Sequence, residues 1–211
     1  MENILVVGAT GTTGRKVVNL LKSSIFFEPV AMVRKNNQVK EFLDQGIKTV
    51  VGNLEEDISH VVSNIDKVVF AAGSGGENVV EVDQEGAKKM IDASKKHAVK
   101  KFVMLSSMGA DQPEAAKELQ DYLKAKHNAD EYLKASKVPY TIVRPGSLTN
   151  EKGTGRIELG KILQKQGYIS RDDVAKVLTM SLYDNATTNK HFEILSGSLP
   201  IEQALIDMSN K

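Results

Sequence analysis

Several residue types and patterns are missing or scarce in this chain of 211 residues. It has no cysteine, which excludes disulfides, thiolate catalysis and cysteine-ligated zinc, and is consistent with the cytosol as the expected compartment. The 4 histidines are scattered, so we expect no dedicated metal site. No apolar run approaches the roughly 18 residues that a membrane-spanning helix needs.

The chain also has almost no excess of charge of either sign, with a formal net charge of +1. Lys and Arg together number 28, and Asp and Glu together number 27. Because a balanced charge attracts neither nucleic acid nor an anionic membrane surface, we expect neither as a partner. The N-terminus enters a predicted core strand at once, so we expect no signal peptide. We expect one domain over residues 1–211, as a monomer or homodimer that binds a small molecule.

The N-terminal stretch combines a strand, a glycine-rich turn and a helix. Ile4 to Val7 form a continuous apolar run that is typical of a buried parallel strand, and a helix is predicted over Arg15–Leu21. Between them, Gly8 permits a tight turn, Gly11 lets the backbone approach a pyrophosphate, and Gly14 lets the helix pack closely. The pyrophosphate would lie at the helix N-terminus. The pattern predicts dinucleotide binding; the alternative is an ordinary strand–helix turn.

The end of the second predicted strand, Glu28–Val33, bears on the choice of dinucleotide. Folds that bind NAD usually place Asp or Glu about 20 residues beyond the glycines. Arg34 stands at that distance from Gly14. A guanidinium pairs with a 2′-phosphate and cannot accept a hydrogen bond from a free hydroxyl, so NADP(H) is preferred over NAD(H). Arg15 could add a second positive charge, whereas the alternative for Arg34 and Lys35 is a solvated pair of cations.

Strand and helix patterns alternate up to residue 146. Further strands are predicted over 47–51, 67–72, 101–105 and 140–143, and helices over 36–43, 79–97 and 113–135. This alternation predicts an α/β fold with six parallel strands joined by right-handed crossovers. A seventh strand is predicted over 191–195, a short strand pair near 156–159, and helices over 172–183 and 201–208, the first capped by Ser170. Segment 147–170 and these helices are expected to cover the cleft.

Small and polar residues follow the third and fourth predicted strands, where ligands of open α/β sheets bind. Asn53 could reach the edge of an adenine or could cap the next short helix, and both interpretations stay open. Ala71, Ala72 and Gly73 would let a cofactor lie against the backbone. The stretch 73–76 could be a mobile flap or a plain loop.

A second group of candidate residues follows the fifth predicted strand. Tyr122 and Lys126 are four residues apart on one helix and therefore share a face. A nearby ammonium lowers the pKa of a phenol and can also bind a cofactor ribose. The phenol could then exchange a proton with the oxygen of a carbonyl/alcohol couple, oriented by Ser106 or Ser107. The alternatives are that Tyr-x-x-x-Lys is an ordinary helix pattern, or that Tyr132 is the relevant tyrosine.

Five stretches carry a resemblance: GATGTTGRKV, AMVRK, FVMLSSMGAD, LKAKHNADEYLKASKVPYTIVRPGSLTNE and GYISRDDVAKVL. Together they resemble the atypical short-chain dehydrogenase/reductases, in particular the small NAD(P)-binding oxidoreductases of the NmrA-like and biliverdin/flavin-reductase-like group. The resemblance covers essentially the whole chain. It implies a doubly wound Rossmann fold with a mostly parallel, seven-stranded sheet and a small C-terminal lid.

The resemblance also implies roles for individual residues. Phosphate contacts would come from Thr10, Gly11, Thr12 and Thr13, and the 2′-phosphate contact from Arg34. Lys126 would touch the nicotinamide ribose. The nicotinamide itself would be bordered by Pro145, Gly146, Ser147 and Leu148.

The activity expected from these features is NADPH-dependent hydride transfer to a small carbonyl, quinone or flavin. The reaction would occur beside Ser74, Ser107, Tyr122 and the Ser147 loop, with Ser107, Tyr122 and Lys126 as candidate catalytic residues. Flavin-reducing relatives need no tyrosine acid. One alternative is a non-catalytic NADP-binding redox sensor of NmrA type. Another is a nucleotide-sugar epimerase or dehydratase, disfavoured by the short segment that follows the sixth strand.

Overall fold

The computed structural model describes residues 1–116, 118–183 and 186–209, whose strands form a large sheet and a small one. The large sheet has the order β11-β8-β10-β6-β5-β4-β1-β2-β3, and the small one pairs β7 with β9. The strands are β1 (Glu2–Val7), β2 (Phe27–Val33), β3 (Lys48–Val51), β4 (Lys67–Phe70), β5 (Lys101–Leu105), β6 (Tyr140–Pro145), β7 (Ser147–Thr149), β8 (Arg156–Gly160), β9 (Tyr168–Ser170), β10 (Lys190–Ser196) and β11 (Leu199–Pro200).

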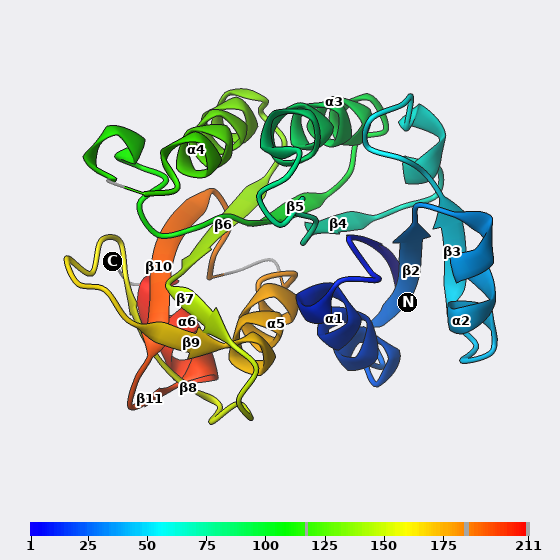
Figure 1. Cartoon of the computed structure of the whole chain (residues 1–211). Helices are drawn as coiled ribbons and strands as arrows, with labels where there is room; N and C mark the ends of the chain where they lie inside the picture. The colour runs from blue at the N-terminus through cyan, green and yellow to red at the C-terminus, as the bar shows by residue number, and fades with distance from the viewer. Residues whose placement is uncertain (117, 184–185, 210–211) are drawn as a thin grey trace.

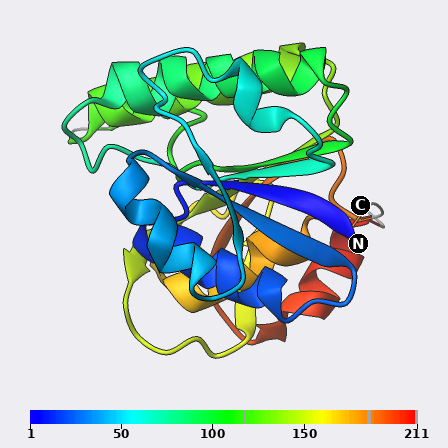
Figure 2. The same ribbon diagram turned by 90° about the vertical axis from the view of Figure 1, so that its right-hand side faces the viewer.

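Helices lie on both faces of the large sheet, as Figures 1 and 2 show. Helices α3 and α4 cover one face, α1, α5 and α6 cover the other, and α2 lies beside the edge strand β3. The helices are α1 (Thr12–Lys22), α2 (Val39–Leu43), α3 (Ala87–Lys96), α4 (Gln120–Ala135), α5 (Arg171–Met180) and α6 (Ile201–Ser209). The predicted α/β Rossmann fold is therefore confirmed. No helix among the described residues is long and apolar enough to cross a bilayer.

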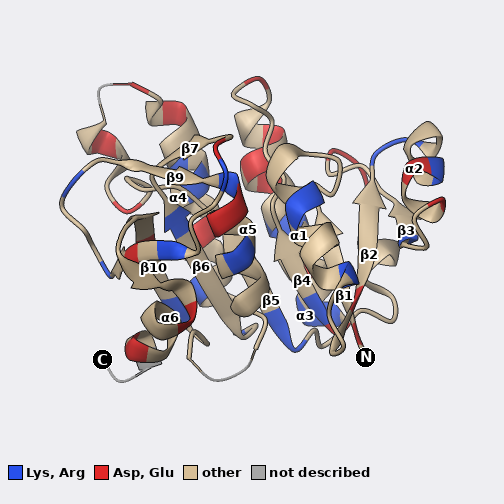
Figure 3. Ribbon diagram, turned by 90° about the horizontal axis from the view of Figure 1, so that it is seen from below, with Lys and Arg blue, Asp and Glu red and all other residues tan. Residues whose placement is uncertain are grey.

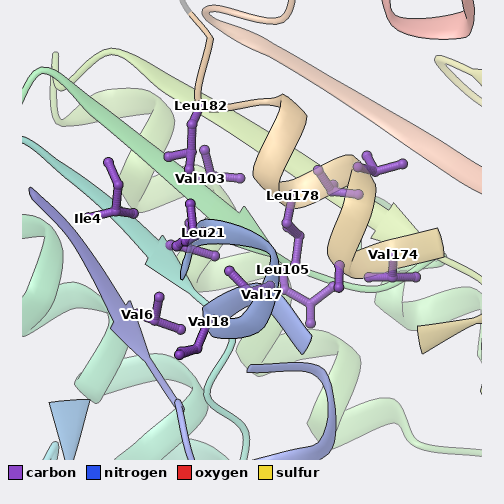
Figure 4. Close-up of a cluster of buried hydrophobic side chains, with 14 of the residues drawn as sticks. Ile4, Val6, Val17, Val18, Leu21, Val103, Leu105, Val174, Leu178 and Leu182 are labelled. Carbon is purple, nitrogen blue, oxygen red and sulfur yellow. The ribbon is translucent and has the colours of Figure 1, made fainter. Parts of the chain in front are cut away.

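The alternation of side chains along β1 divides the core into two clusters. Ile4 and Val6 belong to the cluster under α1 and α5, whereas Leu5 and Val7 belong to the cluster under α3 and α4. This is the expected behaviour of a strand buried on both faces. Figure 4 shows the first cluster, in which Val17, Val18 and Leu21 of α1, Val174 and Leu178 of α5, and Leu182 just after α5 lie beside Ile4, Val6, Val103 and Leu105.

The strand count exceeds the prediction. Seven strands, from β3 through β1 and β6 to β10, run parallel, and these are the seven that the sequence predicts. Two more strands extend the sheet, because β8 pairs antiparallel with β10 and β11 pairs antiparallel with β8. The strand pair predicted near 156–159 is wrong as a local pair. β8 instead joins a strand distant in sequence, and β7 pairs with β9 in the small sheet.

Two predicted helices differ from those observed. The segment 113–135 forms a short 3-10 turn over Pro113–Ala115, and α4 begins only at Gln120. Leu119 interrupts the predicted helix because its φ of 59° lies in the left-handed region; residue 117 lies outside the described chain. The segment predicted as one helix over 79–97 starts as a π-helix over Val79–Gly86 and continues as α3.

The helices after residue 170 take part in the core. Ser170 caps α5 as predicted, since its side chain accepts a hydrogen bond from the Asp173 N–H at 3.0 Å. Helix α5 lies beside α1 in the same layer and contributes buried Val174 and Leu178 to the core. It therefore forms part of the sheet's covering layer.

In the view of Figure 3, basic and acidic residues are interspersed over the elements.

Candidate functional site

The glycine turn between β1 and α1 brings three backbone segments into close contact. Gly8 has a φ of +85°, and a Cβ built on it would lie 2.7 Å from the Ala72 Cα. A Cβ on Gly14 would lie 2.1 Å from the Gly8 carbonyl oxygen. A larger residue at either position would collide with backbone, so the turn depends on glycine at both.

The first turn of α1 is suited to an anion. Its N-cap residue, Gly11, provides no side-chain cap, and no acidic residue lies in the first turn. The N–H groups at the start of a helix and the positive end of its dipole attract phosphate. Thr10 and Thr12 are at least partly exposed, whereas Thr13 is buried, so its hydroxyl is the least available of the predicted phosphate contacts.

A cavity of about 380 Å³ opens beside this turn, at the carboxyl ends of β1 to β4. It brings together many predicted residues, namely Gly8, Thr10, Gly11, Arg34, Asn53, Ala71, Ala72, Gly73 and Ser74. The cavity is also lined by residues that belong to no predicted site, including Met32, Gln38, Leu54, Glu77, Asn78 and Val82. Their positions follow from the meeting of strand ends and could not be read from any motif.

The two arginines differ in their surroundings. Arg34 is exposed at the cavity, and the turn after it is held by the Gln38 side chain, whose Oε1 accepts the N–H groups of Arg34 and Lys35 at 3.0 and 2.9 Å. Arg15 forms an ion pair with Glu41 and donates from Nε to the Thr10 carbonyl at 2.9 Å. Since Glu41 compensates its charge, Arg15 is the weaker candidate for binding phosphate.

Asn53 lines the cavity and also stabilises its own loop. Its Oδ1 accepts the Glu55 N–H and its Nδ2 donates to the Glu56 carboxylate, each at 3.2 Å. The side chain closes a turn, and the next helical segment begins only at Ser59. Asn53 therefore closes a turn and does not cap a helix, so the capping interpretation is wrong. A contact between Asn53 and adenine stays a prediction.

Tyr122 and Lys126 lie together on α4, as their spacing predicts. Lys126 is only 3% exposed, and its Nζ lies 5.6 Å from the centre of the Tyr122 ring. The ammonium pairs with the Asp83 carboxylate at 3.0 Å and donates to the Leu105 carbonyl at 3.4 Å. Burial acts to lower the pKa of Lys126, but Tyr122, Asp83 and Asp130 together raise it above its usual value.

The two serines after β5 face different surroundings. Ser106 is buried and donates to Asp130 at 2.8 Å, and the same carboxylate oxygen accepts from the Arg144 Nε at 3.0 Å. Burial raises the pKa of Asp130, against the effect of Arg144 and Ser106. Ser107 is half-buried and donates to the Met108 carbonyl at 3.2 Å. Ser106 thus belongs to a buried polar cluster, and Ser107 is the serine that a ligand could reach.

Tyr132 has a hydrogen-bond partner of its own on α3. Its hydroxyl donates to the Asp92 carboxylate of α3 at 2.8 Å, and this bond raises the pKa of Tyr132. It is held at the contact between α3 and α4. Tyr122 is therefore the tyrosine that accompanies Lys126.

The strand end at Pro145 connects the remaining predicted residues. The Pro145 carbonyl accepts the Met108 N–H at 3.0 Å, and the Gly146 N–H donates to the Ile194 carbonyl at 3.1 Å. Leu148 is partly buried against the core. None of these residues, nor Ser107, Tyr122 or Lys126, lines the cavity itself. Among the described residues no cluster of His, Asp or Glu could hold a metal ion.

A glycine turn at the start of a helix, next to a cavity at the ends of parallel strands, defines a dinucleotide-binding Rossmann protein. The chain belongs to the NAD(P)H-binding family, whose sequence profile matches residues 8–185. This family match confirms the resemblance seen in the sequence and makes a nicotinamide dinucleotide the class of cofactor.

Two similar proteins carry the name of an epimerase. The uncharacterized sugar epimerase YhfK of Bacillus subtilis (strain 168) is 40% identical over 210 residues, which cover 96% of this chain and 98% of that protein. A Bacillus halodurans structure, provisionally named an NAD-dependent epimerase/dehydratase, matches with a TM-score of 0.92 at 41% identity. The match covers 98% of this chain and 99% of that one.

Two others are named as oxidoreductases. The oxidoreductase ylbE from Lactococcus lactis matches with a TM-score of 0.89 at 30% identity, over 99% of this chain and 97% of that one. The NAD(P)H azoreductase of Xenophilus azovorans is 28% identical over 202 residues, which cover 90% of this chain and 67% of that protein. Two of these four names include a nicotinamide dinucleotide, and the reactions that the names give differ.

Proposed function

We propose that this protein is an NADPH-dependent oxidoreductase that passes hydride to a small carbonyl, quinone or flavin. The observation that carries the proposal is the cavity, which combines the glycine turn, the small residues of the β4 end and an exposed Arg34. The reductases among its relatives support the reaction class.

The residues present fit such a dinucleotide. The uncapped start of α1 would hold the diphosphate, and Arg34 would hold the 2′-phosphate. Lys126 would bind the nicotinamide ribose through an N–H, and Tyr122 would give its hydroxyl proton to the acceptor oxygen. When bound, NADPH would supply the hydride from C4 of its nicotinamide.

Replacement of Arg34 tests the choice of dinucleotide. In Arg34→Ala, affinity for NADPH should fall about tenfold or more, with little change for NADH, because only the phosphorylated ribose loses a charged partner. Calorimetry with both nucleotides measures this. The matched control is Lys35→Ala, which removes an exposed neighbouring cation that does not line the cavity. Equal affinities of the native protein for NADH and NADPH would contradict the proposal.

Reduction of an acceptor distinguishes an enzyme from a sensor. The protein is incubated with NADPH and a free flavin, a quinone or a dicarbonyl, and the consumption of NADPH is measured by its absorbance. Turnover with one of them supports the oxidoreductase. Binding of NADPH without turnover of any acceptor would favour the redox sensor.

A nucleotide-sugar epimerase is the second candidate, because the two relatives that match nearly the whole chain at 40% and 41% identity carry such names. An epimerase returns its hydride to the substrate and consumes no NADPH. Incubation with nucleotide-sugars and chromatography of the products would detect interconversion. Interconversion without net oxidation of NADPH would replace our proposal with this one.

A further inference from the structure

A line of buried charges lies between the sheet and helices α3 and α4. Asp83, Lys126, Asp130 and Arg144 are at most 3% exposed, and their charges alternate in sign. Asp130 and Arg144 pair with each other at 3.0 Å, and Asp83 pairs with Lys126 at 3.0 Å. Burying an ionised group costs free energy unless the group is paired, and each of these four charges has a partner of opposite sign. We therefore ask what the paired charges do at the site.

Asp83 connects two parts of the site that are distant in sequence. Its Oδ1 pairs with the Lys126 ammonium, and its Oδ2 accepts the Ser74 N–H at 2.9 Å. Ser74 lines the cavity directly after Gly73. One carboxylate therefore ties α4 to the loop that forms one wall of the cavity.

We propose that Asp83 is a positioning residue of this site: it aims the Lys126 ammonium at the dinucleotide ribose and fixes the Gly73–Ser74 backbone against which the dinucleotide lies. This inference rests on the proposed function and deepens it.

The geometry explains why a carboxylate stands here. The Lys126 ammonium pairs with Asp83 and donates one N–H to the Leu105 carbonyl, and an ammonium has three N–H donors, so in the proposed complex another of them would bind the ribose. The groups that face Lys126 are Asp83 from the π-helical segment, Tyr122 and Asp130 from α4, and the Leu105 carbonyl from β5. Since Asp130 is engaged by Arg144 and Ser106, Asp83 is the carboxylate in contact with Lys126 among the described residues.

A double-mutant cycle tests whether Asp83 acts through Lys126. Asp83→Asn should weaken the binding of NADPH and NADH alike, by roughly tenfold, since a hydrogen bond to a charged group is lost at the ribose common to both. In a Lys126→Met background the same change should weaken binding by clearly less than in the native background, because only the anchor at Ser74 is then left to lose. This equal loss for both nucleotides differs from the selective loss expected for Arg34→Ala. Additive effects in the cycle, or an unchanged affinity of Asp83→Asn, would overturn the proposal.

Two further measurements keep the test decisive. Amide hydrogen exchange at Ser74, followed by NMR without nucleotide, should be faster in Asp83→Asn than in the native protein; unchanged exchange would overturn the anchoring role even if no nucleotide bound. If Asp83→Asn does not fold, Asp83→Glu takes its place in the cycle, with a smaller expected loss because the charge is kept. Asp92→Asn, which removes the carboxylate bonded to Tyr132, is the matched control and should retain native affinity. Absence of binding by the native protein would instead refute the proposed function.

Discussion

At the scale of single residues, the site depends on which way neighbouring side chains point. Ser106 and Ser107 are adjacent, yet the first lies in a buried cluster with Asp130 and the second stays accessible. Tyr122 and Tyr132 share a helix, yet only Tyr122 lies beside Lys126. These contacts reduce the candidate catalytic residues to Ser107, Tyr122 and Lys126.

The role of Tyr122 can be tested by removing its hydroxyl. In Tyr122→Phe, turnover of a dicarbonyl should fall about a hundredfold, because the carbonyl oxygen loses its proton donor. Turnover of a free flavin should change little, since that transfer needs no tyrosine acid. Steady-state rates with both acceptors measure the difference. Tyr132→Phe on the same helix is the control, and a native rate of dicarbonyl reduction in Tyr122→Phe would remove Tyr122 from the mechanism.

At the scale of elements, the approach of α1 to the end of β1 shapes the cavity. The Gly8 carbonyl lies under the first turn of α1, where it accepts the Gly11 N–H at 2.9 Å. Gly14 faces the same carbonyl from within the helix. The helix start can therefore point at the cavity only while residue 14 lacks a side chain.

Substitution of Gly14 tests this close packing. Gly14→Ala should lower the free energy of unfolding by about 1–3 kcal/mol, because its Cβ would overlap the Gly8 carbonyl and force the helix outward. Urea denaturation measures the change. Asn19→Ala, on the exposed part of α1, is the control and should be neutral or slightly stabilising. Native stability in Gly14→Ala would show that the turn tolerates a displaced helix.

At the scale of the whole molecule, ion pairs join the starts of β1, β4 and β5. Glu2 pairs with Lys67 at 2.9 Å and with Lys100 at 3.0 Å, and Lys100 also pairs with Asp66 at 2.8 Å. Burial acts to raise the pKa of Glu2, but the two lysines lower it overall. Lys100, together with the Asn3 N–H, lowers the pKa of Asp66 against a smaller effect of burial.

These shifts predict a loss of stability in acid. A carboxyl whose pKa is lower in the folded state stabilises it above the unfolded pKa of about 4, and that contribution is lost as pH falls through the folded value. The urea midpoint should therefore decrease as pH falls below about 4. Replacing both Glu2→Gln and Asp66→Asn should lower the midpoint at pH 7 and flatten its dependence on pH. An equally steep dependence in the double variant would assign the acid sensitivity to other carboxyls.

The sequence by itself determined the parallel strands, the glycine turn and the place of Arg34. Each depends on local pattern: apolar runs such as Ile4–Val7 form buried strands, and Gly8 and Gly14 occupy positions where a Cβ would collide with backbone. It also placed Tyr122 and Lys126 on one face, because helical spacing is regular.

Only the tertiary structure decided which groups surround these residues. Asp83 stands in a segment that the sequence predicts only as part of a helix, and its pairing with Lys126 arises only when two helical segments pack side by side. The antiparallel pairing of β8 with β10 likewise joins distant segments. Local patterns specify elements, but contacts between distant elements depend on how side chains fill the shared interior, which no single stretch encodes.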